Sequence, residues 1–234
     1  MTTDAAKGRL IAAIDVPTAT AALDLASRLE GHVGMLKLGL QLFVAEGPSV
    51  IRQVREQFPE LEVFLDLKLH DIPNTMRGAI RSARTLGARF ITVHAGSGIA
   101  HLKACVEEAG EDLGILAVTV LTSQDEQACR EAGHTRSAAD LVAMRAECAR
   151  EAGCAGVVCS GQELARVCEA APDLFKVVPG IRPAGADIGD QKRVMTPAVA
   201  IGAGATHLVV GRPITTASDV ALAADEIVRQ IASA

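Results

Sequence analysis

Short runs of aliphatic and β-branched residues alternate with longer, alanine-rich amphipathic runs along the chain. The short runs predict buried strands, and the long runs, with apolar positions every three to four residues, predict helices that cover a sheet. The predicted strands span residues 10–16, 34–39, 62–68, 89–94, 114–121, 156–159, 175–179 and 206–211. The predicted helices span residues 18–30, 42–57, 74–86, 97–109, 137–152, 162–170, 190–202 and 219–232.

Eight strand–helix units in 234 residues predict a single-domain (β/α)8 TIM barrel over residues 1–234. An open, doubly wound sheet is the alternative, because periodicity alone does not show whether the sheet closes. Gly87, Gly153 and Gly204 each stand between a predicted helix and the next strand, which predicts left-handed helix caps. The glycine-rich segment 202–205 follows a helix and precedes a strand, the reverse of a phosphate-binding loop, so we assign it to a turn.

Composition and charge exclude several classes of function. The net charge is −5 and the chain has no Trp or Tyr, whereas nucleic-acid surfaces are usually basic and use aromatic side chains for stacking. We find no apolar run of about 18 residues, so no membrane span is predicted. The first residues lack the apolar core of a secretory signal, and the six cysteines form no C-x-x-C pair. We therefore expect a cytoplasmic protein with reduced cysteines and no nucleic-acid or membrane partner.

Charged and polar side chains gather where the predicted strands end. In a barrel all these ends open at one mouth, where active sites are built. The residues concerned are Asp15, Lys37, Asp66, Lys68, His94, Thr122, Ser123 and Arg212.

Asp66 and Lys68 are two residues apart, so both side chains are expected on one side of the strand, ~6–7 Å apart along it. Lys37 on the neighbouring strand can reach the same place. These residues predict an alternating array of carboxylates and ammonium groups, with Asp71 or Asp15 as its fourth member. Alternating charges let each group stay ionised while partly buried. A structural ion-pair network is the alternative interpretation.

Two long segments follow predicted strands, at residues 121–136 and 179–190, and the second is typical of a closing lid. The loops after strands seven and eight form a recurrent phosphate site in such barrels. Gly211 would let backbone N–H groups approach a phosphate, and Arg212 would bind it as a fork. Arg182 and Gln191 could add contacts. The expected ligand is therefore a phosphorylated small molecule.

Residues 66–75, DLKLHDIPNT, resemble the signature D-x-K-x-x-D-I-x-x-T of orotidine 5′-phosphate decarboxylases. The segments AIDV, LKLG, TVLTS, PGIRP and VVGRPI also resemble that family, in the same order, and the likeness runs from about residue 10 to 216. The shorter pattern D-x-K-x-x-D alone is shared with a related group of sugar-phosphate enzymes.

The resemblance implies decarboxylation of orotidine 5′-monophosphate (OMP) to UMP, the last step of de novo UMP synthesis, without cofactor or metal. It implies a homodimer in which Asp71 and Thr75 reach the neighbouring subunit's site. Lys68 is then the proton donor to C6, Asp66 lies beside the substrate carboxylate, and Lys37 links Asp66 to the ribose. The remaining roles are a ribose contact for Asp15, pyrimidine contacts for Thr122 and Ser123, and phosphate contacts for Arg182, Gln191, Gly211 and Arg212.

Two rival hypotheses remain. A metal-dependent sugar-phosphate decarboxylase or aldolase would need a carboxylate for Mg²⁺ beside Asp66, where Lys37 stands instead. A catalytically silent protein that binds a phosphorylated ligand would not need a buried charge array. His70 has no assigned role beyond packing at a subunit boundary, and we expect His94 and Cys159 to be mainly structural.

Overall fold

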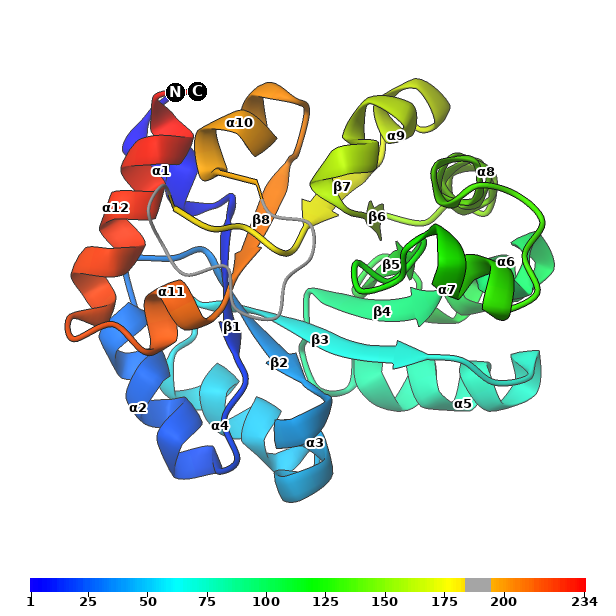
Figure 1. Ribbon diagram of the computed structural model, residues 1–234. Coiled ribbons are helices and arrows are strands. Elements are labelled where there is room, and N and C mark those ends of the chain that lie inside the picture. The colour runs from blue at the N-terminus through cyan, green and yellow to red at the C-terminus, as the bar shows by residue number, and fades with distance from the viewer. Residues whose placement is uncertain (184–194) are drawn as a thin grey trace.

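The computed structural model describes residues 1–183 and 195–234, in which eight parallel strands close into one barrel (Figure 1). Each strand pairs with the next one along the chain, and β1 pairs with β8. The strands are β1 (Leu10–Ile14), β2 (Met35–Gly39), β3 (Glu62–Leu69), β4 (Phe90–His94), β5 (Gly114–Val118), β6 (Gly156–Val158), β7 (Phe175–Val178) and β8 (His207–Val210). This closure confirms the predicted (β/α)8 barrel and rules out the open sheet.

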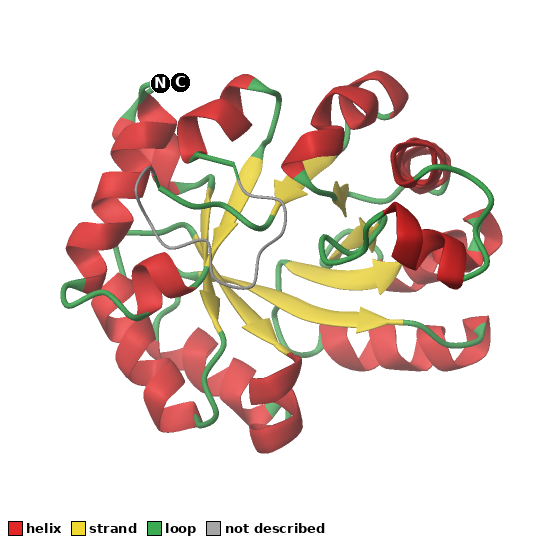
Figure 2. Ribbon diagram, viewed as in Figure 1, coloured by secondary structure: helices red, strands yellow, loops and turns green. Residues whose placement is uncertain are grey.

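Helices surround the strands on the outside of the barrel (Figure 2). They are α2 (Ala19–Leu29), α3 (Leu40–Glu46), α4 (Ser49–Gln57), α5 (Pro73–Arg84), α6 (Ile99–Ala109), α8 (Ala138–Glu151), α9 (Leu164–Ala170), α10 (Pro197–Gly202) and α12 (Val220–Ala232). The prediction of one helix over 42–57 is wrong, because Gly47, with φ of 65°, and Pro48 separate α3 from α4. Proline has no N–H to continue a helical ladder. Residues 190–194 of another predicted helix lie outside the described residues.

Three short helices were not predicted: α1 (Thr3–Lys7), α7 (Glu126–Glu131) and α11 (Arg212–Thr215). Helix α7 lies in the segment after β5 that we expected to be a loop. The two ends of the chain meet, since the amino group of Met1 donates a hydrogen bond to the carbonyl of Ala232 (3.1 Å). None of the helices in the described ranges has the length and apolar character needed to cross a membrane.

The glycines predicted to cap helices adopt the left-handed conformation, with φ of 70°, 80° and 105° at Gly87, Gly153 and Gly204. Each one joins the end of a helix to the start of the next strand, at the end of the barrel where the strands begin. These turns are short, and the longer connections lie at the opposite end of the barrel, where the strands end.

Two apolar cores hold the barrel together. One lies between the sheet and the helices, and the other fills the barrel interior. The interior core consists of Ile11, Ala13, Met35, Phe64, Phe90, Leu116, Val177 and Val209. Because side chains alternate along a strand, the residues two positions further on also point inward, but at the mouth. The apolar interior therefore ends directly beneath the charged positions.

Candidate active site

Four charged side chains form a continuous chain of ion pairs at the mouth of the barrel. Lys37 and Asp66 stand two positions after the inward-facing Met35 and Phe64, so they enter the mouth from β2 and β3. The ammonium of Lys37 lies 3.0 Å from Asp15 Oδ1 and 3.6 Å from Asp66 Oδ2. The ammonium of Lys68 lies 2.7 Å from Asp66 Oδ2. Asp15 is thus the fourth member of the array within this chain.

Lys68 does not sit on a regular strand. Its φ is 48°, in the left-handed region that residues with a Cβ seldom occupy. The pairing of β3 with β4 passes from Leu65–Ile91 directly to Leu69–Val93, so three residues of β3 face Thr92 alone. The expectation that Asp66 and Lys68 meet is confirmed, but a bulge rather than regular strand geometry brings them together. Backbone strain of this kind clusters at functional sites.

The electrostatics of Asp66 favour the ionised carboxylate. Burial by itself would raise its pKa, but the nearby ammonium groups of Lys37 and Lys68 outweigh that effect. Hydrogen bonds from Lys68 and Thr92 add to the lowering, so the pKa of Asp66 lies below its usual value. The pKa of His94 is lowered too, by burial first and then by His70 and Lys68, which favours a neutral imidazole.

Thr92 is a member of the site that the sequence analysis missed. It is fully buried on β4, two positions after Phe90, and its hydroxyl donates a hydrogen bond to Asp66 Oδ1 (3.0 Å). The same hydroxyl accepts one from the backbone N–H of Lys68 (2.9 Å). A polar residue at an inward position inside a strand was the available signal, but we considered only strand ends.

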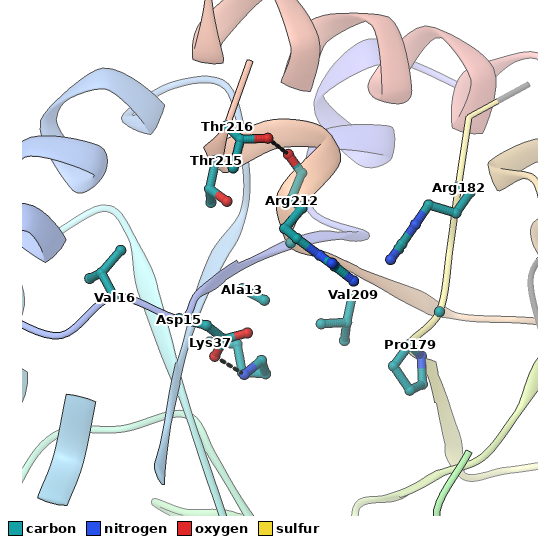
Figure 3. A pocket seen from close by; sticks show the side chains of 12 residues that line it. Ala13, Asp15, Val16, Lys37, Pro179, Arg182, Val209, Arg212, Thr215 and Thr216 are labelled. Atoms are coloured by element: carbon teal, nitrogen blue, oxygen red, sulfur yellow. Dashed lines mark hydrogen bonds and ion pairs between the residues drawn. The ribbon is translucent and has the colours of Figure 1, made fainter. Parts of the chain in front are cut away.

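A cavity of about 410 Å³ opens beside the array, above β1, β2, β7 and β8. Its walls are formed by Ala13, Asp15, Val16, Lys37, Pro179, Gly180, Arg182, Val209, Gly211, Arg212, Thr215 and Thr216. Figure 3 shows the guanidinium groups of Arg182 and Arg212 extending into it from two sides. Arg182, Gly211 and Arg212, the candidates for a phosphate contact, thus line the same cavity as Asp15 and Lys37. The sequence analysis did not single out Thr215 or Thr216, whose hydroxyl donates to the carbonyl of Arg212 (2.8 Å).

Comparison with known proteins decides the family. Residues 8–227 match the model of the "Orotidine 5'-phosphate decarboxylase / HUMPS family". The chain belongs to this family. Similar curated proteins named orotidine 5'-phosphate decarboxylase include one from Sphingopyxis alaskensis, 51% identical over 92% of this chain and 95% of that protein. Another, from Moorella thermoacetica, is 47% identical over 97% of this chain and 93% of that protein.

Solved structures agree with the family assignment. The crystal structure of orotidine 5'-phosphate decarboxylase from Lactobacillus acidophilus has a TM-score of 0.84 and 34% identity, covering 95% of this chain and 98% of that chain. The enzyme of that name from Pyrococcus horikoshii has a TM-score of 0.77 and 27% identity, with coverage of 95% and 99%. The fold of this chain therefore matches solved structures named orotidine 5'-phosphate decarboxylase over 95% of its length.

In this family member, several predicted site residues lie away from the cavity. Asp71 and Thr75 are exposed, and the carboxylate of Asp71 accepts a hydrogen bond from the N–H of its neighbour Ile72 (2.7 Å). Thr122 and Ser123 follow β5 and do not line the cavity walls. Gln191 lies outside the described residues.

The remaining candidates have ordinary structural surroundings. Burial raises the pKa of the Cys159 thiol to about 12, so the thiol stays protonated. The ring centroids of His70 and His94 are 5.4 Å apart. His70 Nε2 lies 2.6 Å from Ser97 Oγ. Within residues 1–183 and 195–234, no group of three or more His, Cys, Asp or Glu side chains is arranged to hold a metal ion.

Proposed function

We propose that the protein converts orotidine 5′-monophosphate to UMP and CO2, the last step of de novo UMP synthesis, without cofactor or metal. The observation that carries the proposal is the array at the mouth, in which Lys68 lies 2.7 Å from Asp66 and Lys37 bridges Asp66 and Asp15. Membership of the family adds support, because relatives about half identical to this chain bear the name of that activity.

Lys68 would serve as the general acid. When the bond between C6 and the carboxylate carbon breaks, CO2 departs and the electron pair stays on C6. The ammonium of Lys68 stabilises that charge and then transfers its proton to C6, giving UMP and a neutral amine that regains a proton from water. Asp66 holds the ammonium in place through the 2.7 Å contact.

Asp66 would also lie beside the substrate's own carboxylate. At ~4 Å and an effective dielectric constant near 20, the repulsion between two carboxylates is on the order of 4 kcal/mol. Enzymes lower barriers by ~8–23 kcal/mol or more, so this repulsion supplies only part of the effect. The Lys68 ammonium, exclusion of water and binding of remote substrate groups would supply the rest.

The cavity would hold the ribose and the phosphate. Asp15 and Lys37 belong to the array and also line the cavity, and they would contact ribose hydroxyls. Arg182 and Arg212, with the backbone at Gly211, would bind the phosphate, since guanidinium forks match phosphate oxygens. We assign Gln191 to the same phosphate group, and Thr122 and Ser123 to the pyrimidine, on the family resemblance.

A homodimer would complete each site. Asp71 and Thr75 are exposed, and so are three apolar side chains, at Leu40, Val44 and Ile72. Val44 is 80% exposed, and Ile72, the neighbour of Asp71 in the sequence, is 66% exposed. A subunit contact would remove such apolar side chains from water. We assign them to the subunit contact, and Asp71 and Thr75 to the neighbouring subunit's site.

The shared site can be tested by mixing two inactive variants, Lys68→Ala and Asp71→Ala. A hybrid dimer would contain one site with both residues intact, so an equal mixture should regain about a quarter of the wild-type rate. Absence of recovery, with subunit exchange verified by differently tagged chains, would contradict the shared site.

The reaction itself is tested by the loss of absorbance when the purified protein meets orotidine 5′-monophosphate. Turnover that persists in EDTA supports the proposal, whereas turnover abolished by EDTA and restored by Mg²⁺ would favour a metal-dependent sugar-phosphate enzyme. Binding of UMP without any turnover would favour the catalytically silent binding protein.

The six free cysteines agree with the reducing cytoplasm, the compartment we propose.

A further inference from the structure

The seam between β3 and β4 contains a side chain that bridges two members of the charged array. At the bulge, the backbone N–H of Lys68 donates to the hydroxyl of Thr92 (2.9 Å). The hydroxyl oxygen also lies 3.0 Å from Asp66 Oδ1. Thr92 is fully buried, so it has no access to a substrate.

The direction of these hydrogen bonds is determined by chemistry. An ionised carboxylate only accepts, and a backbone N–H only donates, so the single hydroxyl proton of Thr92 points to Asp66. The carbonyl of Leu65, at 3.5 Å, is a more distant acceptor without charge. Asp66 Oδ1 is thereby engaged, which leaves Oδ2 facing Lys68 Nζ at 2.7 Å and Lys37 Nζ at 3.6 Å.

We propose that Thr92 is a positioning residue for the decarboxylation, holding the backbone of Lys68 in its left-handed conformation and turning the Asp66 carboxylate toward both lysines. This inference rests on the proposed function. A threonine is suited to the task because one hydroxyl both accepts and donates, and its β-branched side chain is stiff in a strand. Loss of the hydroxyl would leave the backbone N–H of Lys68 and Asp66 Oδ1 each without this partner.

A purely structural role makes a different prediction. A threonine that merely closes a bulge affects unfolding, whereas a positioning residue affects the proton donor and the ionisation of its carboxylate partner. The protein offers a matched control at the other end of the barrel. There the hydroxyl of Thr206, the residue before β8, accepts a hydrogen bond from the backbone N–H of Lys176 on β7 (2.8 Å).

The test compares Thr92→Val, which removes the hydroxyl at nearly constant shape, with Thr92→Ser, which keeps it, and with Thr206→Val. We expect Thr92→Val to lower kcat roughly ten- to hundredfold, the effect of losing a hydrogen bond to a charged group, with KM within about threefold of wild type. Thr92→Ser should stay within about threefold of wild-type kcat, and Thr206→Val should be as active as wild type. The acid limb of kcat against pH should move to higher pH in Thr92→Val, because the Asp66 pKa rises.

Equal losses in Thr92→Val and Thr92→Ser, or an unmoved acid limb, would overturn the proposal. If Thr92→Val does not fold, Thr92→Ala against Thr92→Ser gives the same comparison with one oxygen atom as the difference. A ¹³C titration of the Asp66 carboxyl group in each variant needs no turnover. Inactive wild-type protein would therefore refute the proposed function, while the titration would still decide whether Thr92 sets the state of Asp66.

Discussion

Replacement of Lys68 by Ala removes the ammonium that lies 2.7 Å from Asp66 Oδ2. A unit charge about 4 Å from the developing carbanion is worth about 4 kcal/mol at an effective dielectric constant near 20. Since about 1.4 kcal/mol corresponds to a factor of ten, this electrostatic loss amounts to about three powers of ten in rate. Loss of the positioned proton donor adds typically ~10²–10⁴. We therefore expect kcat to fall by about 10⁵-fold or more.

The assay is the absorbance change on conversion of orotidine 5′-monophosphate, with the affinity for UMP measured in parallel. The cavity is lined by Arg182 and Arg212 and not by Lys68, so the variant should bind UMP within about tenfold of wild type. Lys68→Arg is a matched control: it keeps the charge, but a guanidinium does not release its proton in proteins. It should therefore remain at least ~10² below wild type.

Lys68→Gly separates the ammonium from the backbone strain. Glycine adopts a φ of 48° without a clash at Cβ, so this variant should be no less stable than Lys68→Ala and equally inactive. The assignment of Lys68 as proton donor would be refuted if a folded Lys68→Ala protein kept its activity within about tenfold of wild type. A parallel loss of UMP affinity would show that the substitution had disturbed the whole site instead.

Four further predictions concern stability and the phosphate end. Burial first, and then the charges of Arg9 and Arg89, lower the pKa of His207 from 6.5 to about 4. Because the unfolded chain takes up this proton at the higher pKa, the free energy of unfolding should fall by about 3 kcal/mol as pH falls from 6.5 to 4. Urea titrations of His207→Gln should show a smaller fall. Gly156→Ala should destabilise by ~1–3 kcal/mol, because its Cβ would lie 2.7 Å from the Phe175 carbonyl oxygen. Gly78→Ala, in helix α5 with free space around the position, should stabilise the protein by ~0.5–1 kcal/mol in the same urea titrations. Arg212→Ala should raise KM at least tenfold, whereas an unchanged KM would contradict its contact with the phosphate.

The barrel could be predicted because its determinants are local. Each strand–helix unit carries its own apolar period, and several of the turns between units carry a glycine, as at Gly87 and Gly153. Eight such units leave few ways to pack. The errors were local too. The helix expected over 42–57 breaks at Pro48, and the short helix α7 interrupts a segment expected to be a loop.

The residue types of the site could also be predicted in part. Asp66, Lys68 and Lys37 stood out because charges interrupt apolar strands, and Arg212 stood out because it follows β8. Thr92 did not stand out, since a threonine within a strand is common and its partners are 24 and 26 residues away in the sequence.

The sequence by itself determined the order of strands and helices, the chemistry gathered at the strand ends and the family. Only the tertiary structure decided which groups touch. It chose Asp15 over Asp71 as the fourth member of the array within one chain, and it placed Lys68 on a bulge of β3. The physical reason is that ion pairs and hydrogen bonds act over about 3 Å, a distance determined by strand register and closure of the sheet rather than by spacing along the chain.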